Sequence, residues 1–357
     1  MKPILILFFA ASSGLVLASN PCDCSPVCGC GHDGQPTVPI SVMGDHLHPQ
    51  GEWMISLRHM FMDMDGMYDG SNSVSPAAVH SANYLVSPTR MTMEMQMLGV
   101  MYAPSEDVTL MAMLPHVQND MEHVINSGAA MLLMANGGNR GFDTRSSGVG
   151  DLKLSALLRM VDQGDHHLHG GFGISLPTGS ISERDIVPGP GGRLSRQLPA
   201  AMQPGSGSID LLPSLTYRYH ADDWVFGAQA RGVFRTDKNH HDYHLGHRAE
   251  LDAWVSTCPC NWLSVNAGLG FRWEDQLQGS QADVARTPPM PPGARTVPTA
   301  WGENYGGMQL DAVLGLSVQV AESHRIGMDL RLPIWQDVNG YRLGQDLTAT
   351  IGWLWTL

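Results

Sequence analysis

Hydrophobic and polar residues alternate with a period of two over most of the chain after residue 50. The clearest run is 347–357, where one face carries Leu347, Ala349, Ile351, Trp353, Trp355 and Leu357 and the other face is mostly threonine and glycine. Similar runs recur at 223–235, 262–273 and 307–320. A period of two is typical of β-strands with one apolar face. The pattern therefore predicts an all-β protein.

Counting such runs predicts twelve strands, at 53–62, 91–103, 107–115, 148–160, 166–177, 209–220, 223–235, 244–257, 262–273, 307–320, 324–335 and 346–357. Most are long enough to cross a bilayer at a tilt, which takes about 9–11 residues. Tight links at 104–106, 161–165, 221–222, 258–261 and 321–323 alternate with longer ones at 63–90, 116–147, 178–208, 237–243, 274–306 and 336–345. Short turns on one rim and long loops on the other are typical of outer-membrane barrels. We therefore expect a transmembrane antiparallel up-and-down β-barrel over 53–357, with short periplasmic turns and long extracellular loops, rather than a soluble β-sandwich.

The N-terminus predicts export. Lys2 precedes an apolar run at 4–11, and small residues lead to Ala18, as in a secretory signal peptide at 1–18. Aromatic residues such as Trp53, Tyr217 and Trp224 lie on the apolar face near the short turns, where a periplasmic girdle is expected. The protein is therefore expected in the outer membrane of a Gram-negative-type bacterium, surrounded by outer-membrane lipid. Segment 19–52 is Cys-rich with little periodicity; we expect it in the periplasm, where it lies under the barrel or plugs it.

Composition excludes several other classes of protein. Lys and Arg number 21 against 34 Asp and Glu, a net charge of −13 that would repel nucleic acid. Beyond the first twenty residues no stretch approaches the roughly 18 apolar residues of a membrane helix. No GxSxG elbow, HExxH helix or P-loop is present. The sequence therefore indicates neither a nucleic-acid-binding protein nor an enzyme.

If the apolar face meets lipid, the opposite face lines the lumen. That face would carry charges of both signs, on Arg58, Glu94, Asp151, Lys153, Arg231, Arg235, Arg248, Glu250, Asp252, Arg272, Asp311, Asp329 and Arg331. Such charges pair and hold the wall rigid, or form a constriction that selects solutes. Eight-stranded barrels are filled, whereas those with sixteen to eighteen strands hold an aqueous channel. We therefore expect a narrow polar lumen suited to small solutes.

Two stretches resemble motifs of a known family. Ser147-Gly148-Val149-Gly150-Asp151 resembles an SGxGD strand entry, and Pro177-Thr178-Gly179 resembles a PTG strand exit, of the outer-membrane transporters described as the meta-pathway phenol-degradation family. Both motifs are also ordinary turn chemistry. The similarity in strand layout runs from about residue 50 to the C-terminus. The resemblance implies an outer-membrane barrel that admits aromatic or other small organic solutes, and it names no catalytic residue.

The 22 methionines introduce a second kind of chemistry, because thioether sulfur is a soft ligand that suits Cu(I). If Thr92, Glu94 and Gln96 face the lumen, the stripe from Met91 to Met97 faces lipid and is merely apolar surface. The remaining metal candidates are Met60, Met62 and Met64 on the first strand, and the loop histidines His240, His241, His244 and His247. Close imidazoles bind Cu(II), Zn or Ni.

The six cysteines are Cys22, Cys24, Cys28, Cys30, Cys258 and Cys260. The predicted topology places all of them in the periplasm. An even number of cysteines in an oxidising compartment favours disulfides, whereas the CxCxxxCxC spacing of the first four is also compatible with a thiophilic metal.

These observations predict a porin-like outer-membrane channel or uptake protein for small solutes, aromatic or hydrophobic ones included. The alternative is a barrel that binds copper or a similar metal for resistance or acquisition, and a further alternative is a structural or adhesive barrel. No cofactor is expected unless the copper alternative holds.

Overall fold

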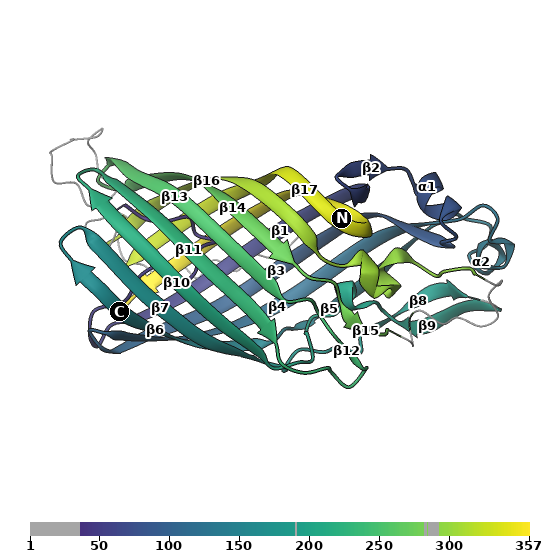
Figure 1. The fold of residues 1–357 in the computed structure, drawn as a ribbon, viewed down its shortest axis with the longest axis horizontal. Helices are drawn as coiled ribbons and strands as arrows, with labels where there is room; N and C mark the ends of the chain where they lie inside the picture. The colour runs from purple at the N-terminus through teal and green to yellow at the C-terminus, as the bar shows by residue number, and fades with distance from the viewer. Residues whose placement is uncertain (1–35, 190, 282–283, 285–292) are drawn as a thin grey trace.

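The computed structural model describes residues 36–189, 191–281, 284 and 293–357. Within them the chain forms a closed β-barrel that carries small helices and hairpins at one end (Figure 1). The wall is built from β1 (Trp53–Gly70), β3 (Val86–Ser105), β4 (Val108–Ile125), β5 (Gly141–Val149), β6 (Leu152–Gln163), β7 (His166–Leu176), β10 (Asp210–Ala221), β11 (Trp224–Arg235), β13 (Arg248–Cys260), β14 (Leu263–Glu274), β16 (Gly307–Ala321) and β17 (His324–Thr356). The predicted all-β barrel is confirmed.

The first and last strands close the ring. Neighbouring strands pair antiparallel around the wall, and β1 pairs with β17 from Met54 opposite Thr356 upward. Residues 324–338 of β17 pair with β16, whereas residues 338–356 pair with β1, so this strand crosses the wall twice. The reversal lies at Gly340, whose φ of 54° is left-handed. Among the described residues the closed ring has eleven strands, and counting β17 twice gives twelve crossings, as predicted.

One crossing contains a bulge. The upper part of β4 pairs with β5, where His116 lies opposite Val149, and the lower part pairs with β6, where Met113 lies opposite Lys153. The register shifts by one residue at Gly150 and Asp151, so β5 and β6 are the two halves of one descending strand. A bulge of this kind bends the strand locally.

The two rims differ as the sequence predicts. All five short links leave two residues between strands, for example Gly164-Asp165 and Asp222-Asp223, and the left-handed φ values of Gly164 (56°) and Asp222 (49°) suit such turns. The predicted loop at 336–345 is wrong, because the strand continues to a tight turn at Gly340. The strands β1, β3, β4 and β5 also continue well into the predicted loops 63–90 and 116–147.

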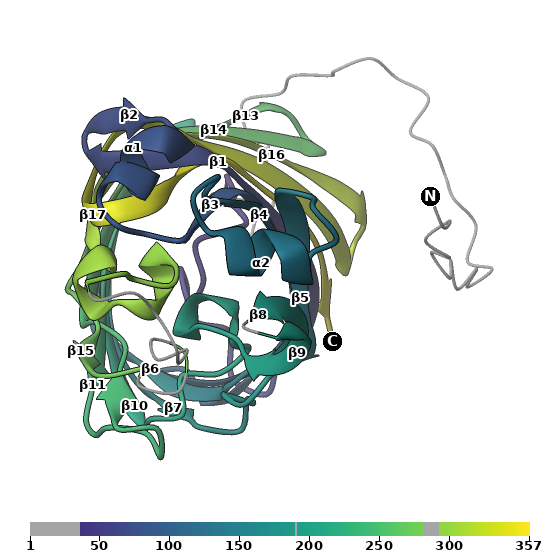
Figure 2. The ribbon, with the colours of Figure 1, turned by 90° about the vertical axis from the view of Figure 1, so that its right-hand side faces the viewer.

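The loop end of the barrel carries the small elements. These are β2 (Asn72–Val74), α1 (Pro76–Ser81), α2 (Ala130–Ala135), β8 (Arg184–Gly189), β9 (Gly192–Gln197), β12 (Tyr243–His244), β15 (Gln278–Gly279) and the 3₁₀ turns η1 (Ala200–Met202), η2 (Pro298–Ala300) and η3 (Gly302–Asn304). Seen along the barrel axis, they lie across the mouth (Figure 2). None of the helices among the described residues is long and apolar enough to cross a membrane.

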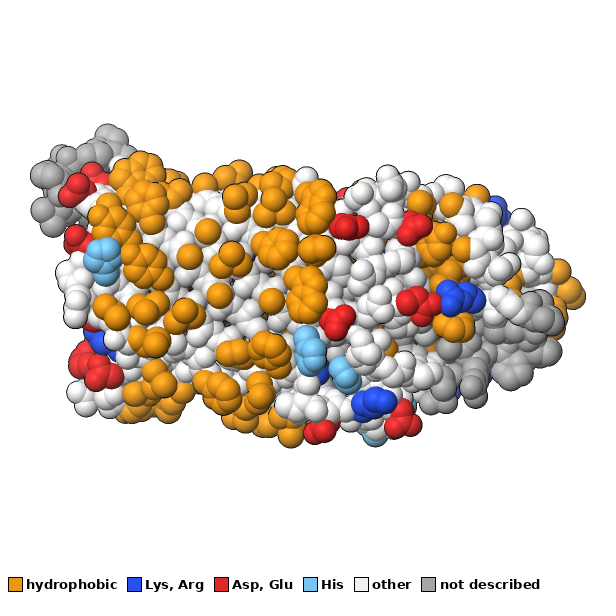
Figure 3. All heavy atoms as spheres, viewed as in Figure 1, with side chains coloured by type: hydrophobic (Ala, Val, Ile, Leu, Met, Phe, Trp, Pro, Cys, Tyr) orange, Lys and Arg blue, Asp and Glu red, His pale blue; other side chains and the backbone are white. Residues whose placement is uncertain are grey.

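The outside of the barrel carries an apolar band over its short-turn part, and charged residues gather beyond it (Figure 3). Alternate residues of the strands make this band, with Leu57, Leu98, Leu114 and Leu269 each exposed on the outer face. Trp53, Tyr217 and Trp224 are exposed at the short-turn end, where the predicted aromatic girdle lies. Large apolar side chains in such a contiguous belt fit a lipid environment.

Candidate functional site in the barrel lumen

The N-terminal segment fills the short-turn end of the lumen, and we call residues 36–48 the plug. It is bonded to the inner face of five strands: Thr37 N–H donates to Ser264 Oγ (2.9 Å), Ser41 N–H to Asp329 Oδ2 (2.8 Å), His48 N–H to Thr109 Oγ1 (3.0 Å), Gln229 Nε2 donates to the Met43 carbonyl (3.0 Å), and His169 Nε2 lies 2.9 Å from the Gly44 carbonyl. Contacts with strands all around the ring require a position within it (Figure 2). The sequence is compatible both with a segment that lies under the barrel and with one that plugs it, and in the structure residues 36–48 plug the barrel.

Two glycines form the seat of the plug. A side chain at Gly327 or Gly352 would meet Ile40, with a Cβ at Gly352 only 2.9 Å from Ile40 Cγ1. Ile40 packs there with Met54 and Leu354 in a buried apolar cluster. The spaces beside the plug measure about 20 and 50 Å³. Such volumes hold a few waters at most, so neither space admits an organic solute while the plug stays in place.

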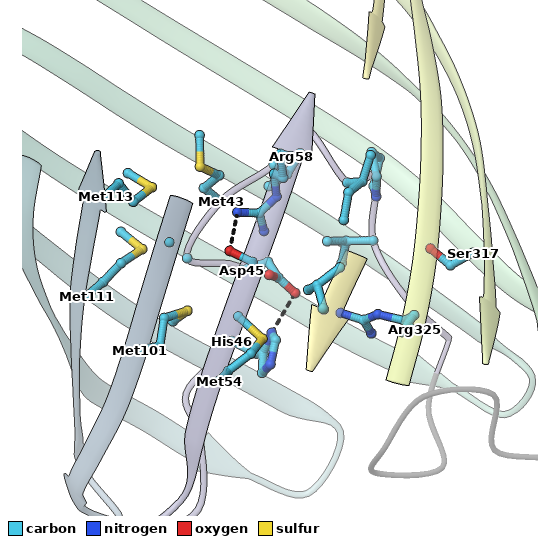
Figure 4. A pocket seen from close by; sticks show the side chains of 18 residues that line it. Met43, Asp45, His46, Met54, Arg58, Met101, Met111, Met113, Ser317 and Arg325 are labelled. Carbon is cyan, nitrogen blue, oxygen red and sulfur yellow. Dashed lines mark hydrogen bonds and ion pairs between the residues drawn. The ribbon is translucent and has the colours of Figure 1, made fainter. Parts of the chain in front are cut away.

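A buried carboxylate sits at the centre of the plug. Asp45 lies among His46, Arg58 and Arg325 (Figure 4), and its Oδ2 is 2.8 Å from His46 Nδ1. Burial raises the pKa of Asp45, but His46, Arg218 and Arg325 outweigh this effect and hold the pKa well below its usual range. The plug therefore carries a negative charge that cationic groups of the wall hold in place.

The inner faces of β11, β13, β14 and β17 carry acidic and basic side chains that form ion pairs with one another. We call this part of the barrel the charged wall. Asp252 accepts from Arg231 (2.9 Å) and pairs with Arg331 (2.8 Å), while Glu250 pairs with Arg231 (3.1 Å). Gly270 stands between β13 and β16, where a Cβ would lie 2.6 Å from Arg331 Nη1. The absent side chain therefore lets Arg331 reach Asp252. Arg331 also donates to Ser41 of the plug (3.0 Å).

Most of the predicted lumen residues do face inward. They are Arg58, Asp151, Lys153, Arg231, Arg235, Arg248, Glu250, Asp252, Arg272, Asp311, Asp329 and Arg331. The prediction that Glu94 faces the lumen is wrong. Glu94 lies on the outer face of β3, in register with Phe61 and with exposed Gln118. The lumen as a whole is also less polar than predicted, because the inner faces of β1, β3 and β4 are rich in methionine.

The two family-like motifs meet in the wall at the β5–β6 bulge. The Asp151 carboxylate accepts from the backbone of Gly179 (2.9 Å) and from the Ser206 hydroxyl (2.7 Å), and Thr178 Oγ1 donates to the Gly150 carbonyl (3.0 Å). A Cβ at Gly179 would lie 2.7 Å from Gly205 Cα. These hydrogen bonds join the bulge to the end of β7. The two motifs therefore stabilise the wall and do not form a binding site for a solute.

Methionines predominate on the other side of the lumen, where Ser56, Arg58 and Gly99 interrupt them. We call this side the methionine wall: Met54, Met60, Met62 and Met64 on β1, Met91, Met93, Met95, Met97 and Met101 on β3, and Met111, Met113 and Met121 on β4. Cross-strand register places Met60 opposite Met95, and Met62 opposite Met93. Met91 and Met97 are buried whereas Leu98 is exposed on the opposite face. The prediction that the stripe from Met91 to Met97 faces lipid is therefore wrong.

The methionine wall ends in an apolar cluster near the mouth, which we call the outer core. Its buried members are Met67, Val79, Tyr84, Met91, Met121, Leu198, Met202 and Leu343. They come from β1, β3, β4, β17, α1, η1 and the adjoining loops, so the outer core covers the methionine side of the lumen at the loop end. The sequence pattern gave no sign of this cluster, because its members are far apart along the chain.

The loop histidines lie in two pairs, with ring centroids 4.4 Å apart for His240 and His241 and 5.8 Å apart for His244 and His247. His241 contacts Ser182 Oγ (3.2 Å) and Gln197 Nε2 (3.1 Å), His244 Nδ1 is 2.9 Å from the Leu245 carbonyl, and His247 accepts from the Arg235 backbone (3.1 Å). The described part of the chain holds no group of three or more His, Cys, Asp or Glu residues arranged for a metal ion. Cys258 and Cys260 are both disulfide-bonded. Cys22, Cys24, Cys28 and Cys30, and the predicted signal peptide, lie outside the described residues.

A closed antiparallel barrel with an apolar belt and a plugged lumen defines an outer-membrane channel-type barrel, and the outer membrane is where it resides. The family model described as "Putative MetA-pathway of phenol degradation" matches residues 79–302, more than half of the chain, so the protein belongs to that family. No curated protein sequence matches the chain significantly.

Solved structures share the fold at low sequence identity. The COG4313 outer membrane channel from Pseudomonas putida F1 aligns with a TM-score of 0.58 and 14% identity, over 88% of this chain and 99% of that one. The KdgM porin (TM-score 0.39, 8% identity, 85% and 98% coverage) and a TodX monoaromatic hydrocarbon channel mutant (0.44, 10%, 86% and 91%) align less closely. The first comparison supports the barrel fold, and the other two carry no further argument.

Proposed function

We propose that this protein is an outer-membrane uptake channel for small apolar solutes, aromatic ones included, which move along the methionine wall and past the plug. The methionine wall is the observation that carries this proposal. It extends from the outer core, where Met91 and Met121 are buried, to the plug, where Ile40 packs on Met54 and Met101. Methionine side chains are unbranched and adaptable, so they can repack around ligands of different shapes.

The charged wall supports the same proposal by its pairing. Asp252 and Glu250 are bonded to the arginines around them, so these charges have local partners. An apolar solute that follows the methionine wall displaces water mainly from apolar side chains, which costs little free energy. Along the charged wall it would have to remove water from ionised side chains, which is unfavourable. The family description, which refers to phenol degradation, is consistent with an aromatic solute.

Uptake of a labelled aromatic compound by cells tests the proposal. Toluene at low concentration is the probe, and the variants are Met95→Asp and the matched control Met95→Leu, with glycerol as a hydrophilic solute. A carboxylate on the methionine wall should lower toluene uptake roughly tenfold, because an unpaired charge resists desolvation, whereas leucine should keep it. Unchanged toluene uptake in Met95→Asp, with the barrel folded, would refute the proposal.

A second candidate function follows from the same wall. Because Met60 lies opposite Met95, and Met62 opposite Met93, thioethers of two strands lie together, and thioether sulfur suits Cu(I). Cu(I) titration of the folded protein and of a Met60→Leu/Met62→Leu/Met64→Leu variant tests it. Stoichiometric binding that the variant loses would favour a copper role, whereas equal weak binding by both proteins would exclude it.

A further inference from the structure

A larger cavity lies at the loop end of the barrel, beyond the outer core. Its volume is about 330 Å³, and it is enclosed by the upper ends of β3, β4 and β5, by α2 and by the β8–β9 hairpin. Apolar side chains dominate its lining, including Leu85, Val86, Met131, Phe142, Pro188 and Leu198. Ligand pockets of proteins measure about 300–1,000 Å³ and are mostly apolar, so this cavity suits one small ring compound.

Four polar atoms around the cavity are buried without a hydrogen-bond partner among the residues that the structure describes. They are His123 Nδ1, Thr144 Oγ1, Arg196 Nε and Thr296 Oγ1, and Thr144 is only 3% exposed. Nearly all buried polar groups in proteins are hydrogen-bonded, so four orphans around one apolar cavity point to a bound polar group. The guanidinium can only donate, and the hydroxyls can donate or accept. A hydroxyl or carbonyl oxygen, which accepts from the guanidinium, is therefore complementary to these atoms.

One side of the cavity is lined by two stacked rings. The His123 and Phe142 rings stack with centroids 4.8 Å apart and planes within 7°. Both rings line the cavity, on the same face of β4 and β5 as Thr144. A planar ring compound packs well against such a surface.

We infer that this cavity binds a monocyclic aromatic compound with an oxygen substituent, and that it is the first binding site of the solute before the lumen. The inference rests on the proposed function for the onward route. Leu198 lines both the cavity and the outer core, and Met121 of the outer core lies opposite Thr144. The cavity therefore adjoins the upper end of the methionine wall.

Equilibrium binding to the purified, folded barrel tests the inference, with phenol and toluene as probes in calorimetry or ligand-observed NMR. Thr144→Val removes one hydroxyl at almost constant shape, so phenol should bind about three- to tenfold more weakly while toluene affinity stays the same. Ala129→Phe places a ring in the cavity and should abolish binding of both probes. Thr92→Val, on the outer face of β3, is the matched control and should bind both like the parent protein.

Equal phenol affinity in the parent protein, Thr144→Val and Ala129→Phe, with heat-modifiable migration showing that each variant is folded, would overturn the inference. Loss of phenol and toluene binding in equal proportion on Thr144→Val would overturn the role of the oxygen substituent. The Met95→Asp variant separates the two proposals, because it should lose uptake and keep phenol binding. Binding that follows these expectations without any toluene uptake would leave the cavity as a site and refute the channel.

Discussion

The charged wall and the methionine wall face the same lumen but are built oppositely. Inward residues of β13 and β17, such as Asp252 and Arg331, are charged and pair with one another, whereas inward residues of β3 from Met91 to Met101 are methionines apart from Gly99. In the apolar band both walls carry apolar residues towards lipid, such as Leu98 and Leu251. The two walls therefore differ in their lumen-facing residues, whereas their lipid-facing residues are alike.

This difference gives each wall a different mechanical property. Paired charges in a low-dielectric interior hold their partners in fixed geometry, and the charged wall uses Asp329 and Arg331 to hold Ser41 of the plug. Methionines impose little geometry and repack easily. A barrel with one rigid side and one adaptable side can hold its plug on the first while a solute passes along the second.

The largest effect should come from breaking the charged wall at its centre. In Asp252→Asn, Arg231 and Arg331 lose the carboxylate that both contact, at 2.9 and 2.8 Å. Removing one partner of a buried ion pair costs about 3–5 kcal/mol, so the free energy of unfolding should fall by that order. Denaturant unfolding of the detergent-solubilised barrel, followed by heat-modifiable migration, measures the change.

Glu94→Gln is the control for this comparison. Glu94 was predicted to face the lumen and lies on the outer face, in register with exposed Gln118. Its substitution should leave stability within about 0.5 kcal/mol of the parent protein. If both variants were equally stable, the charged wall would not be the rigid half of the barrel.

The plug provides the next largest effect. Gly352→Val would place a branched side chain where even a Cβ comes within 2.9 Å of Ile40. Overpacking of this kind costs about 1–3 kcal/mol, which should loosen the plug and raise ion conductance in a planar bilayer. Gly141→Val is the control, because a Cβ there has only an ordinary 3.9 Å contact. Equal conductance in the two variants would mean that Ile40 does not hold the plug.

The fold could be predicted from the sequence because membrane strands have a strict period. Alternation between Leu263 and Trp273, or between Leu347 and Trp355, marks one lipid face, and two-residue turns such as Asp222-Asp223 mark one rim. Neither signal needs information about distant residues. The same signals fail above the membrane, where β1, β3 and β4 continue into what the sequence presented as loops.

The orientation of the methionine stripe was the main error, and the sequence held a signal that could have corrected it. Tyr102 stacks on Trp53 in the periplasmic girdle, with centroids 4.4 Å apart, and Glu94 has the same parity as Tyr102 on β3. An unbroken strand must then present Glu94 outward and Met93 inward. The plug and the outer core could not be predicted, because contacts such as Ser41 with Asp329 join residues hundreds of positions apart.

Thiol labelling sharpens the comparison along one strand. Met121 is 1% exposed in the outer core whereas neighbouring Glu122 is exposed. A membrane-impermeant maleimide should therefore modify Glu122→Cys on intact cells faster than Met121→Cys, by on the order of tenfold, because thiol reactivity requires access. The parent protein sets the background from its own cysteines. Faster labelling at position 121 would reverse the orientation of the methionine wall.

The smallest effect is expected at the loop histidines, which the sequence suggested as a metal site. In the structure His240 pairs with His241 and His244 with His247, but the described residues hold no group of three or more His, Cys, Asp or Glu side chains arranged for a metal ion. His240→Ala/His241→Ala/His244→Ala should therefore leave bound copper and zinc unchanged after equilibrium dialysis and elemental analysis. A stoichiometric metal ion lost in this variant would contradict the expectation. Because these residues offer imidazole nitrogen rather than thioether sulfur, that result would show a metal site built from other residues than the methionine wall.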